Sequence, residues 1–245
     1  MGLEIALIIV GLLIGIVALA SGATSLWLTI KYIRFNRIEN TIGLTGMQIA
    51  RKILDDNGLE HIRVKRTGSL LFGNSYSHYF KKVRLRSFIR HEMSLTSVGI
   101  ATQKAALAIL DKEGDPDMKK RIRMVPLITF GPFAFIPLVI VGALVDYFMF
   151  NGVGWCTITL GVIGFLFYVY SIVLSVLTLK TEKKAQLRAY EILENEYHIT
   201  SEELCAIKEL FHLYNIQYIN DIILSSLELI YTLLEIAIAI KKNAD

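Results

Sequence analysis

The stretch that decides the fold class is "LEIALIIVGLLIGIVALASGATSLWLTI", which runs from Leu3 to Ile30. An α-helix needs about 20 apolar residues to cross the hydrocarbon core of a bilayer, and this stretch is longer than that. A secretory signal peptide has a shorter apolar core that follows Lys or Arg, and neither residue precedes this stretch. We therefore predict a first transmembrane helix over residues 1–30.

Two more apolar stretches predict a transmembrane helix pair over residues 125–179. The first is Val125–Phe150 and the second is Trp155–Leu179. Val125–Phe150 contains three prolines, Pro126, Pro132 and Pro137. Proline frees backbone carbonyls that neighbouring groups must then satisfy, so we expect this helix to be kinked and packed against others.

The last apolar stretch, Ile216–Ile240, carries Asn220, Asp221 and Glu228 as candidate intramembrane polar contacts. A charge at the bilayer centre costs about 2.5 to 3.5 kcal/mol on insertion scales. Either these acids face a polar cavity or a cationic partner, or the helix is partly interfacial or lies at an oligomer seam. We therefore predict a fourth transmembrane or interfacial helix over residues 216–245.

The basic residues lie beside the apolar stretches and predict the topology. They follow the first stretch, precede the second and follow the third, whereas the link "DYFMFNGVGW" has neither Lys nor Arg. By the positive-inside rule, residues 31–124 and 180–215 are cytoplasmic, in a bacterial-type plasma membrane, and both termini face outward. Lys241 and Lys242 at the tail fit this topology less well.

The charge of the chain limits its expected partners, and its two cysteines limit the disulfide and metal chemistry that can be expected. The chain has 245 residues, of which 53% are hydrophobic, and a net charge of +4. The basic residues of 31–124 fit either a positive-inside topology with solvated strands or a surface for anionic lipid or an acidic partner. Nucleic acid is not expected, because the basic residues lie next to membrane segments. Cys156 and Cys205 imply neither a disulfide framework nor a cysteine metal site.

Residues 31–124 predict a small α+β domain. The segment "LTGMQIARKILDDNG" fits a helix, with Thr45 and Gln48 as a capping box and Gly58 as its stop. Alternating apolar residues in "HIRVKR" and around Val83 predict short strands, and a helix follows over Ser94–Asp111. Residues 180–215 predict two further helices. The predicted fold is an α-helical membrane protein of about four spanning helices with a small α+β cytoplasmic domain.

The order of these segments resembles the membrane neutral zinc metallopeptidases of the YugP-like family. The resemblance is carried by "GLTGMQIARKILDDNGL" before a small sheet, then a long helix and paired spans, then "VLTLKTEKKAQLRAYEILE", "ITSEEL" and a terminal apolar helix. It covers nearly the whole chain. It implies that the α+β domain is of metallopeptidase type.

The family carries HExxH on the helix after the sheet. Two histidines at i and i+4 can reach one zinc ion, and the glutamate between them acts as base for the metal-bound water. The resemblance places Gln103 and Leu107 at the histidine positions and Lys104 at the glutamate position. It places Glu182 at the third-ligand position, with Lys184 where the family usually has an acid. Zinc is then not expected as a cofactor, and the zinc helix is degenerate.

We therefore predict a non-catalytic homologue, a pseudoprotease that serves as a scaffold, assembly partner or regulator. Its expected partners are the membrane and a protein, which is either another copy or an active paralogue, and the groove between the 94–111 helix and the sheet is the expected surface. One alternative is an active zinc metallopeptidase with atypical ligands. A second is a membrane scaffold or lipid-binding protein without peptidase ancestry, in which Gln103 lies far from Glu182.

Overall fold

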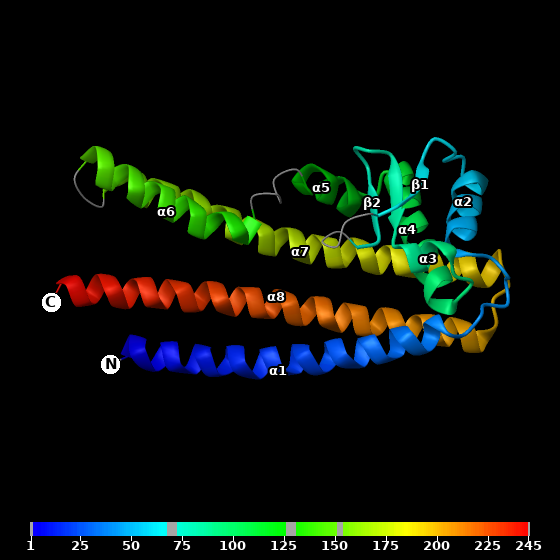
Figure 1. Ribbon diagram of the computed structural model, residues 1–245, viewed down its shortest axis with the longest axis horizontal. Coiled ribbons are helices and arrows are strands. Elements are labelled where there is room, and N and C mark those ends of the chain that lie inside the picture. The colour runs from blue at the N-terminus through cyan, green and yellow to red at the C-terminus, as the bar shows by residue number, and fades with distance from the viewer. Residues whose placement is uncertain (1, 68–72, 126–130, 151–153, 245) are drawn as a thin grey trace. The chain divides into compact units, whose positions relative to one another are not determined.

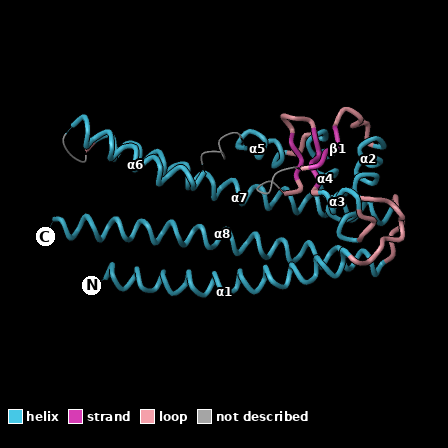
Figure 2. Tube along the Cα trace, in the orientation of Figure 1, coloured by secondary structure: helices cyan, strands magenta, loops and turns pink. Residues whose placement is uncertain are grey.

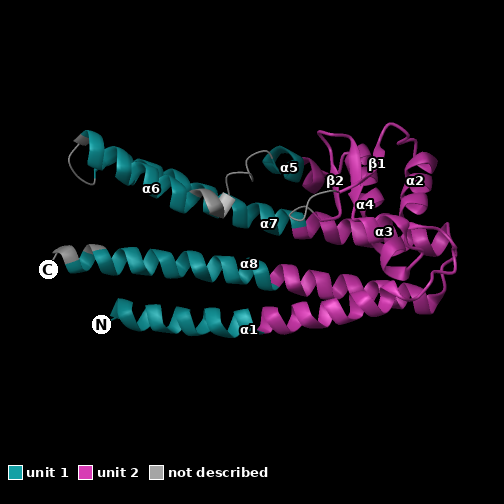
Figure 3. Ribbon diagram, in the orientation of Figure 1, with its two compact units in different colours: residues 1–19, 120–178, 220–245 teal, residues 20–119, 179–219 magenta. Residues whose placement is uncertain are grey.

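The computed structural model describes residues 2–67, 73–125, 131–150 and 154–244, and most of them are helical (Figure 1). The elements in chain order are α1 (Gly2–Asn36), α2 (Gly46–Asp56), β1 (Arg63–Arg66), β2 (Ser75–Ser77), β3 (Lys82–Leu85), α3 (Ser87–His91), α4 (Leu95–Glu113), α5 (Pro116–Met124), α6 (Gly131–Phe150), α7 (Trp155–Asn195) and α8 (Ser201–Ala244). Figure 3 shows two compact units. Unit 1 comprises residues 1–19, 120–178 and 220–245, and unit 2 comprises residues 20–119 and 179–219.

Three helices, α1, α7 and α8, are long and apolar enough to cross a membrane. The length and apolar character of these helices support a membrane protein. They include α8, for which the sequence predicts a transmembrane or an interfacial helix. In α6 the apolar run Phe135–Met149 is shorter. Residues 126–130 of the predicted second span, among them Pro126, lie outside the described residues. The span count of four and the topology therefore stay predictions.

Helices α7 and α8 continue without interruption beyond the predicted membrane segments. α7 runs through residue 179 to Asn195, and α8 joins the helix that begins at Ser201 to the last apolar stretch. Neither proline nor glycine occurs after Gly164 in α7 or anywhere in α8, so nothing in the local sequence ends these helices.

Local signals in the sequence set the element ends in unit 2. Thr45 and Gln48 form the predicted capping box at the start of α2, and Gly58 takes a left-handed φ of +63° after its end. Thr200 and Glu203 exchange the same pair of contacts at the start of α8. The predicted start and end of α2 are confirmed.

A three-stranded sheet in the order β1-β3-β2 lies in unit 2. Its strands are drawn in magenta in Figure 2. β1 pairs parallel with β3, and β2 pairs antiparallel with β3. Val83 and Leu85 on β3 are fully buried, as their alternation predicts.

Helix α4 forms the centre of unit 2. Every residue from Leu95 to Ile109 is buried, and the surrounding core comes from α2, α3, the sheet, α7 and α8. A helix that is buried on all faces needs small side chains where its neighbours approach closely. Gly99 meets this need, because an added Cβ would lie 3.0 Å from the Ile207 side chain.

Candidate degenerate metal centre

Helix α4 holds Gln103, Lys104 and Leu107 in fixed positions. The Ser94 hydroxyl caps the helix by accepting from the Ser97 backbone N–H at 3.1 Å, and Gly114 ends it in the left-handed region at φ 75°. Residues four apart lie on one helical face, so Gln103 and Leu107 share a face. Both are buried, Leu107 completely.

Glu182 on α7 meets this part of α4. The Gln103 amide Nε2 donates to Glu182 Oε2 at 2.9 Å, and the Lys104 ammonium Nζ lies 2.7 Å from the same oxygen. The side chains of Lys104 and Glu182 are only 11% and 13% exposed. Residues nearly 80 positions apart in sequence therefore meet in a nearly closed polar contact.

These side chains do not fit a zinc ion. The ammonium of Lys104 carries a positive charge and would repel the metal. The Leu107 side chain has no donor atom, and Gln103 already donates to Glu182. Catalytic zinc sites use three protein ligands, whereas this cluster offers one carboxylate that is already paired with a cation. The arrangement can hold a charge-assisted hydrogen bond, not a hydrolytic metal.

The expected partner surface along α4 is closed. Because Leu95 to Ile109 are all buried, the helix presents no open face to a bound peptide. The sequence could not reveal this, since burial on all faces follows from packing and not from the residue pattern of one helix.

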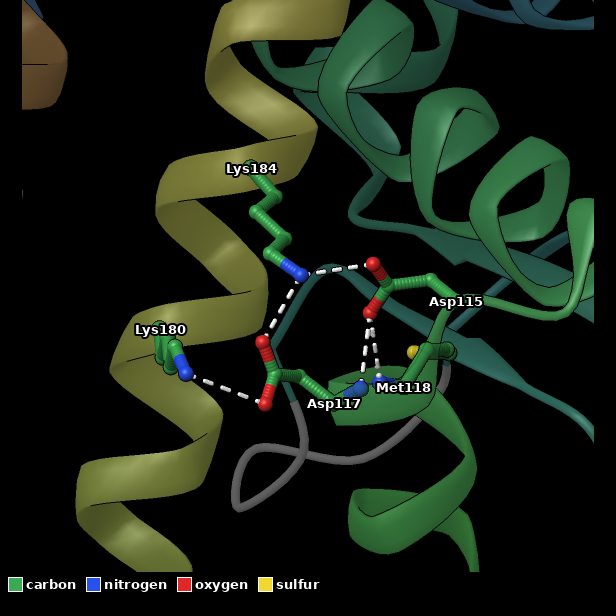
Figure 4. Close-up of polar contacts among 5 residues, drawn as sticks. All are labelled: Asp115, Asp117, Met118, Lys180 and Lys184. Carbon is green, nitrogen blue, oxygen red and sulfur yellow. Dashed lines mark hydrogen bonds and ion pairs between the residues drawn. The ribbon is translucent and has the colours of Figure 1, made fainter.

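A second charged cluster involves Lys180 and Lys184, which lie two residues to either side of Glu182 on α7 (Figure 4). Lys184 Nζ lies 2.6 Å from Asp115 and 2.7 Å from Asp117, and Lys180 lies 3.1 Å from Asp117. Asp115 also accepts from the backbone N–H groups of Asp117 and Met118, so it caps α5, in which Pro116 is the first residue. The basic Lys184 thus has two acidic partners supplied by the α4–α5 junction.

The contacts in this cluster shift the pKa values of Asp115, Asp117 and Lys184 toward their charged forms. Hydrogen bonds from Lys184 and Lys180 hold the pKa of Asp117 below its ordinary value. Burial alone would raise the pKa of Asp115, but the hydrogen bonds from Lys184 and from two backbone N–H groups outweigh burial and lower it. Hydrogen bonds to both aspartates raise the pKa of Lys184.

The histidines in the described residues do not come together to form another metal site. Within residues 2–67, 73–125, 131–150 and 154–244, no group of three or more His, Cys, Asp or Glu side chains could hold a metal. His91 is exposed on α3, whereas His78 contacts Asp111 at 2.6 Å. Tyr76 donates to the same Asp111 oxygen at 2.6 Å, so this carboxylate ties β2 to α4.

The predicted polar positions of α8 lie in unit 1. Asn220 is half-buried, whereas Asp221 and Glu228 are exposed in the protein alone. The Tyr168 hydroxyl on α7 donates to the Ser225 carbonyl at 3.0 Å and lies within reach of the Glu228 carboxylate. A role for these acids in contacts within the membrane stays a prediction.

Asp146 near the end of α6 is a polar residue that the sequence reading did not single out. It is 1% exposed, and its carboxylate accepts from the backbone N–H groups of Gly154, Cys156 and Thr157, at 2.9, 3.2 and 2.7 Å. It therefore caps the start of α7. The sequence contains a signal for this cap, because Asp146 is an acidic residue in an apolar run shortly before a predicted helix start.

The fold and the cluster together define the class of protein. Apolar helices of spanning length accompany an α+β unit, in which the central helix brings Gln103 and Lys104 next to the Glu182 carboxylate of another helix. These features define a helical membrane protein with a small α+β unit.

The chain belongs to the family described as "Putative neutral zinc metallopeptidase", whose model matches residues 9–237. It is also similar to "Putative membrane protease YugP" of Bacillus subtilis (strain 168), with 23% identity over 220 residues that cover 86% of this chain and 91% of that protein. No solved structure shows a significant match. Family membership contradicts the alternative without peptidase ancestry.

Proposed function

We propose that this chain is a catalytically inactive member of its metallopeptidase family that acts as a scaffold, assembly partner or regulator at the membrane. One observation carries the proposal: the Lys104 ammonium lies 2.7 Å from the Glu182 carboxylate. A cation supplied by the protein itself neutralises the carboxylate that a zinc ion would otherwise bind. The contact explains why Glu182 is retained although the other ligands are absent.

The second cluster supports the same proposal. Lys184 stands where the resemblance leads us to expect an acid, and it pairs with Asp115 and Asp117. Two lysines, one on α4 and one on α7, thus hold together helices that a metal site would otherwise link. We infer that ion pairs link these helices in place of a bound metal.

The direct test restores the zinc motif. The full-length variant Gln103→His/Lys104→Glu/Leu107→His should bind about one zinc per chain, because two imidazoles and Glu182 then form a three-ligand set. The wild-type protein, purified and measured in the same way by metal analysis, should hold far less than one zinc. Circular dichroism establishes that each variant folds.

The matched control adds Glu182→Gln to the restored variant, and zinc binding should then fall. A folded restored variant that binds no zinc would contradict descent of this face from a metal site. Stoichiometric zinc in the wild-type protein that disappears on Glu182→Ala would overturn the proposal in favour of an active enzyme with atypical ligands.

As partner we propose a second copy or a relative with an intact HExxH motif. Co-expression of a tagged full-length chain with such a relative should give a complex in detergent, and the relative's peptidase activity should change on association. Unchanged activity together with no recovered complex would exclude the assembly with an active relative. Cross-linking of the chain alone tests self-association.

A further inference from the structure

One face of the sheet gathers basic side chains. Register places Arg63 opposite Lys82 and Lys65 opposite Arg84, so all four lie on the same face of β1 and β3. On β2 the same face carries Ser75 and Ser77. We call the four cations Arg63, Lys65, Lys82 and Arg84 the basic sheet face.

Two exposed aromatic side chains adjoin this face in the turn between β2 and β3. Tyr79 is 56% exposed and Phe80 is 67% exposed. Lys82 Nζ lies 4.5 Å from the centre of the Phe80 ring, and Arg84 Cζ lies 5.6 Å from it. The ring is thus held beside the cations while most of its surface stays open.

The arrangement is costly in the isolated protein. Like charges directly opposite each other on neighbouring strands destabilise a sheet. Desolvation and the nearby Arg84 and Lys65 lower the pKa of Lys82, which reflects this crowding. No acidic residue of β1, β2 or β3 offsets it. Contact with an anionic surface would relieve the repulsion.

We propose that the basic sheet face, with Tyr79 and Phe80 at its edge, docks on the anionic lipid headgroups of a bilayer. Lysine and arginine near an anionic bilayer gain free energy from its negative surface potential. Tyrosine is enriched at membrane–water interfaces, and phenylalanine is common on the apolar face of interfacial segments. The chain's own apolar helices keep it at a membrane, so this partner is always present. The proposal does not depend on loss of catalysis.

The test follows the solvent access of a probe on this face. In the full-length Cys156→Ser/Cys205→Ser protein, Ser77→Cys is labelled with a small fluorophore and reconstituted into vesicles of phosphatidylcholine, with or without phosphatidylglycerol. Quenching by the neutral quencher acrylamide should fall at least about twofold when phosphatidylglycerol is present. About 0.5 M NaCl should reverse the change, because salt screens the attraction.

The decisive variant replaces the basic sheet face by Arg63→Gln, Lys65→Gln, Lys82→Gln and Arg84→Gln. Its quenching should be the same in both vesicles. A control variant removes equal charge from exposed helical positions through Lys52→Gln, Lys112→Gln, Lys183→Gln and Lys208→Gln. This control should keep the full response to phosphatidylglycerol.

Three results would overturn the proposal. The first is equal quenching of the unmodified face in the two vesicle types. The second is an equal loss of response in the control variant, which would make net charge the cause. The third is protection by polyglutamate or RNA without protection by phosphatidylglycerol, which would assign the face to an acidic macromolecule.

Discussion

Lys104 decides the chemistry of the proposed degenerate site. Its ammonium occupies a nearly closed contact with Glu182, where water cannot solvate either charge well. Such a pair contributes little net stability compared with an apolar pair, but loss of one partner leaves the other charge buried. The contribution of the pair to stability is therefore best measured by replacing one of its two partners.

Lys104→Met should lower the free energy of unfolding by about 3 kcal/mol, because Glu182 would keep its burial and lose its cation. The double variant Lys104→Met/Glu182→Met should recover most of this loss. Thermal unfolding of the detergent-solubilised chain measures both. A double variant no more stable than Lys104→Met would show that the pair is not coupled.

Gly46 in the "GLTG" segment has a steric role. An added Cβ would overlap the backbone carbonyl oxygen of Ile89 and lie 3.2 Å from that of Ser97, and backbone atoms cannot rotate away. Gly46→Ala should therefore destabilise the chain by about 2 kcal/mol or more. Gly15→Ala is the control, because open space surrounds Gly15, and its melting temperature should not fall. Equal melting temperatures for both variants would contradict this packing.

At the scale of elements, α5 is held against α7 by acids at its first turn and lysines one helical turn apart. Lys180 and Lys184 lie four residues apart and so point the same way toward Asp115 and Asp117 (Figure 4). This junction consists of charges, so its strength depends on pH.

The sign of that dependence follows from the pKa shifts. Asp115 and Asp117 have folded pKa values below the ordinary 3.8, so their stabilisation is complete well above pH 3.8 and is lost as pH falls through the lower folded values. Lys184 has a raised pKa, so its contribution persists below pH 10.5 and is lost only above its folded value.

Lys184→Met should therefore flatten the acid branch of the stability curve. Between pH 5 and about pH 2 its melting temperature should fall less than that of the wild-type chain. Lys183→Met, at the exposed neighbouring position, should follow the wild-type curve. Parallel curves for wild type and Lys184→Met would refute the role of this junction.

At the scale of the whole molecule, the open question is which side of the membrane unit 2 occupies. The positive-inside rule predicts that residues 31–124 and 180–215 are cytoplasmic. Cys205 near the start of α8 is exposed and provides a natural probe for that prediction.

In a Cys156→Ser background, an impermeant maleimide should leave Cys205 unlabelled in intact bacterial cells and label it after permeabilisation. The control Gly2→Cys in a chain without other cysteines should be labelled in intact cells, because the N-terminus is predicted outside. Labelling of Cys205 in intact cells would reverse the predicted topology.

Several parts of the fold could be read from local sequence. Capping at Thr45 and Thr200, the helix stop at Gly58 and the apolar length of α1 depend on neighbouring residues along the chain. One interpretation was wrong: the groove along α4 is closed, because α2, α3, α7 and α8 cover a helix whose own sequence does not encode their positions.

The sequence by itself determined the apolar helices and the ends of α2, because each depends on composition or on spacing within one segment. Only the tertiary structure decided that Glu182 meets Lys104 and Gln103, and that Lys184 meets Asp115 and Asp117. Those contacts join helices far apart in the chain, and they exist because packing around α4 brings α7 within hydrogen-bonding distance.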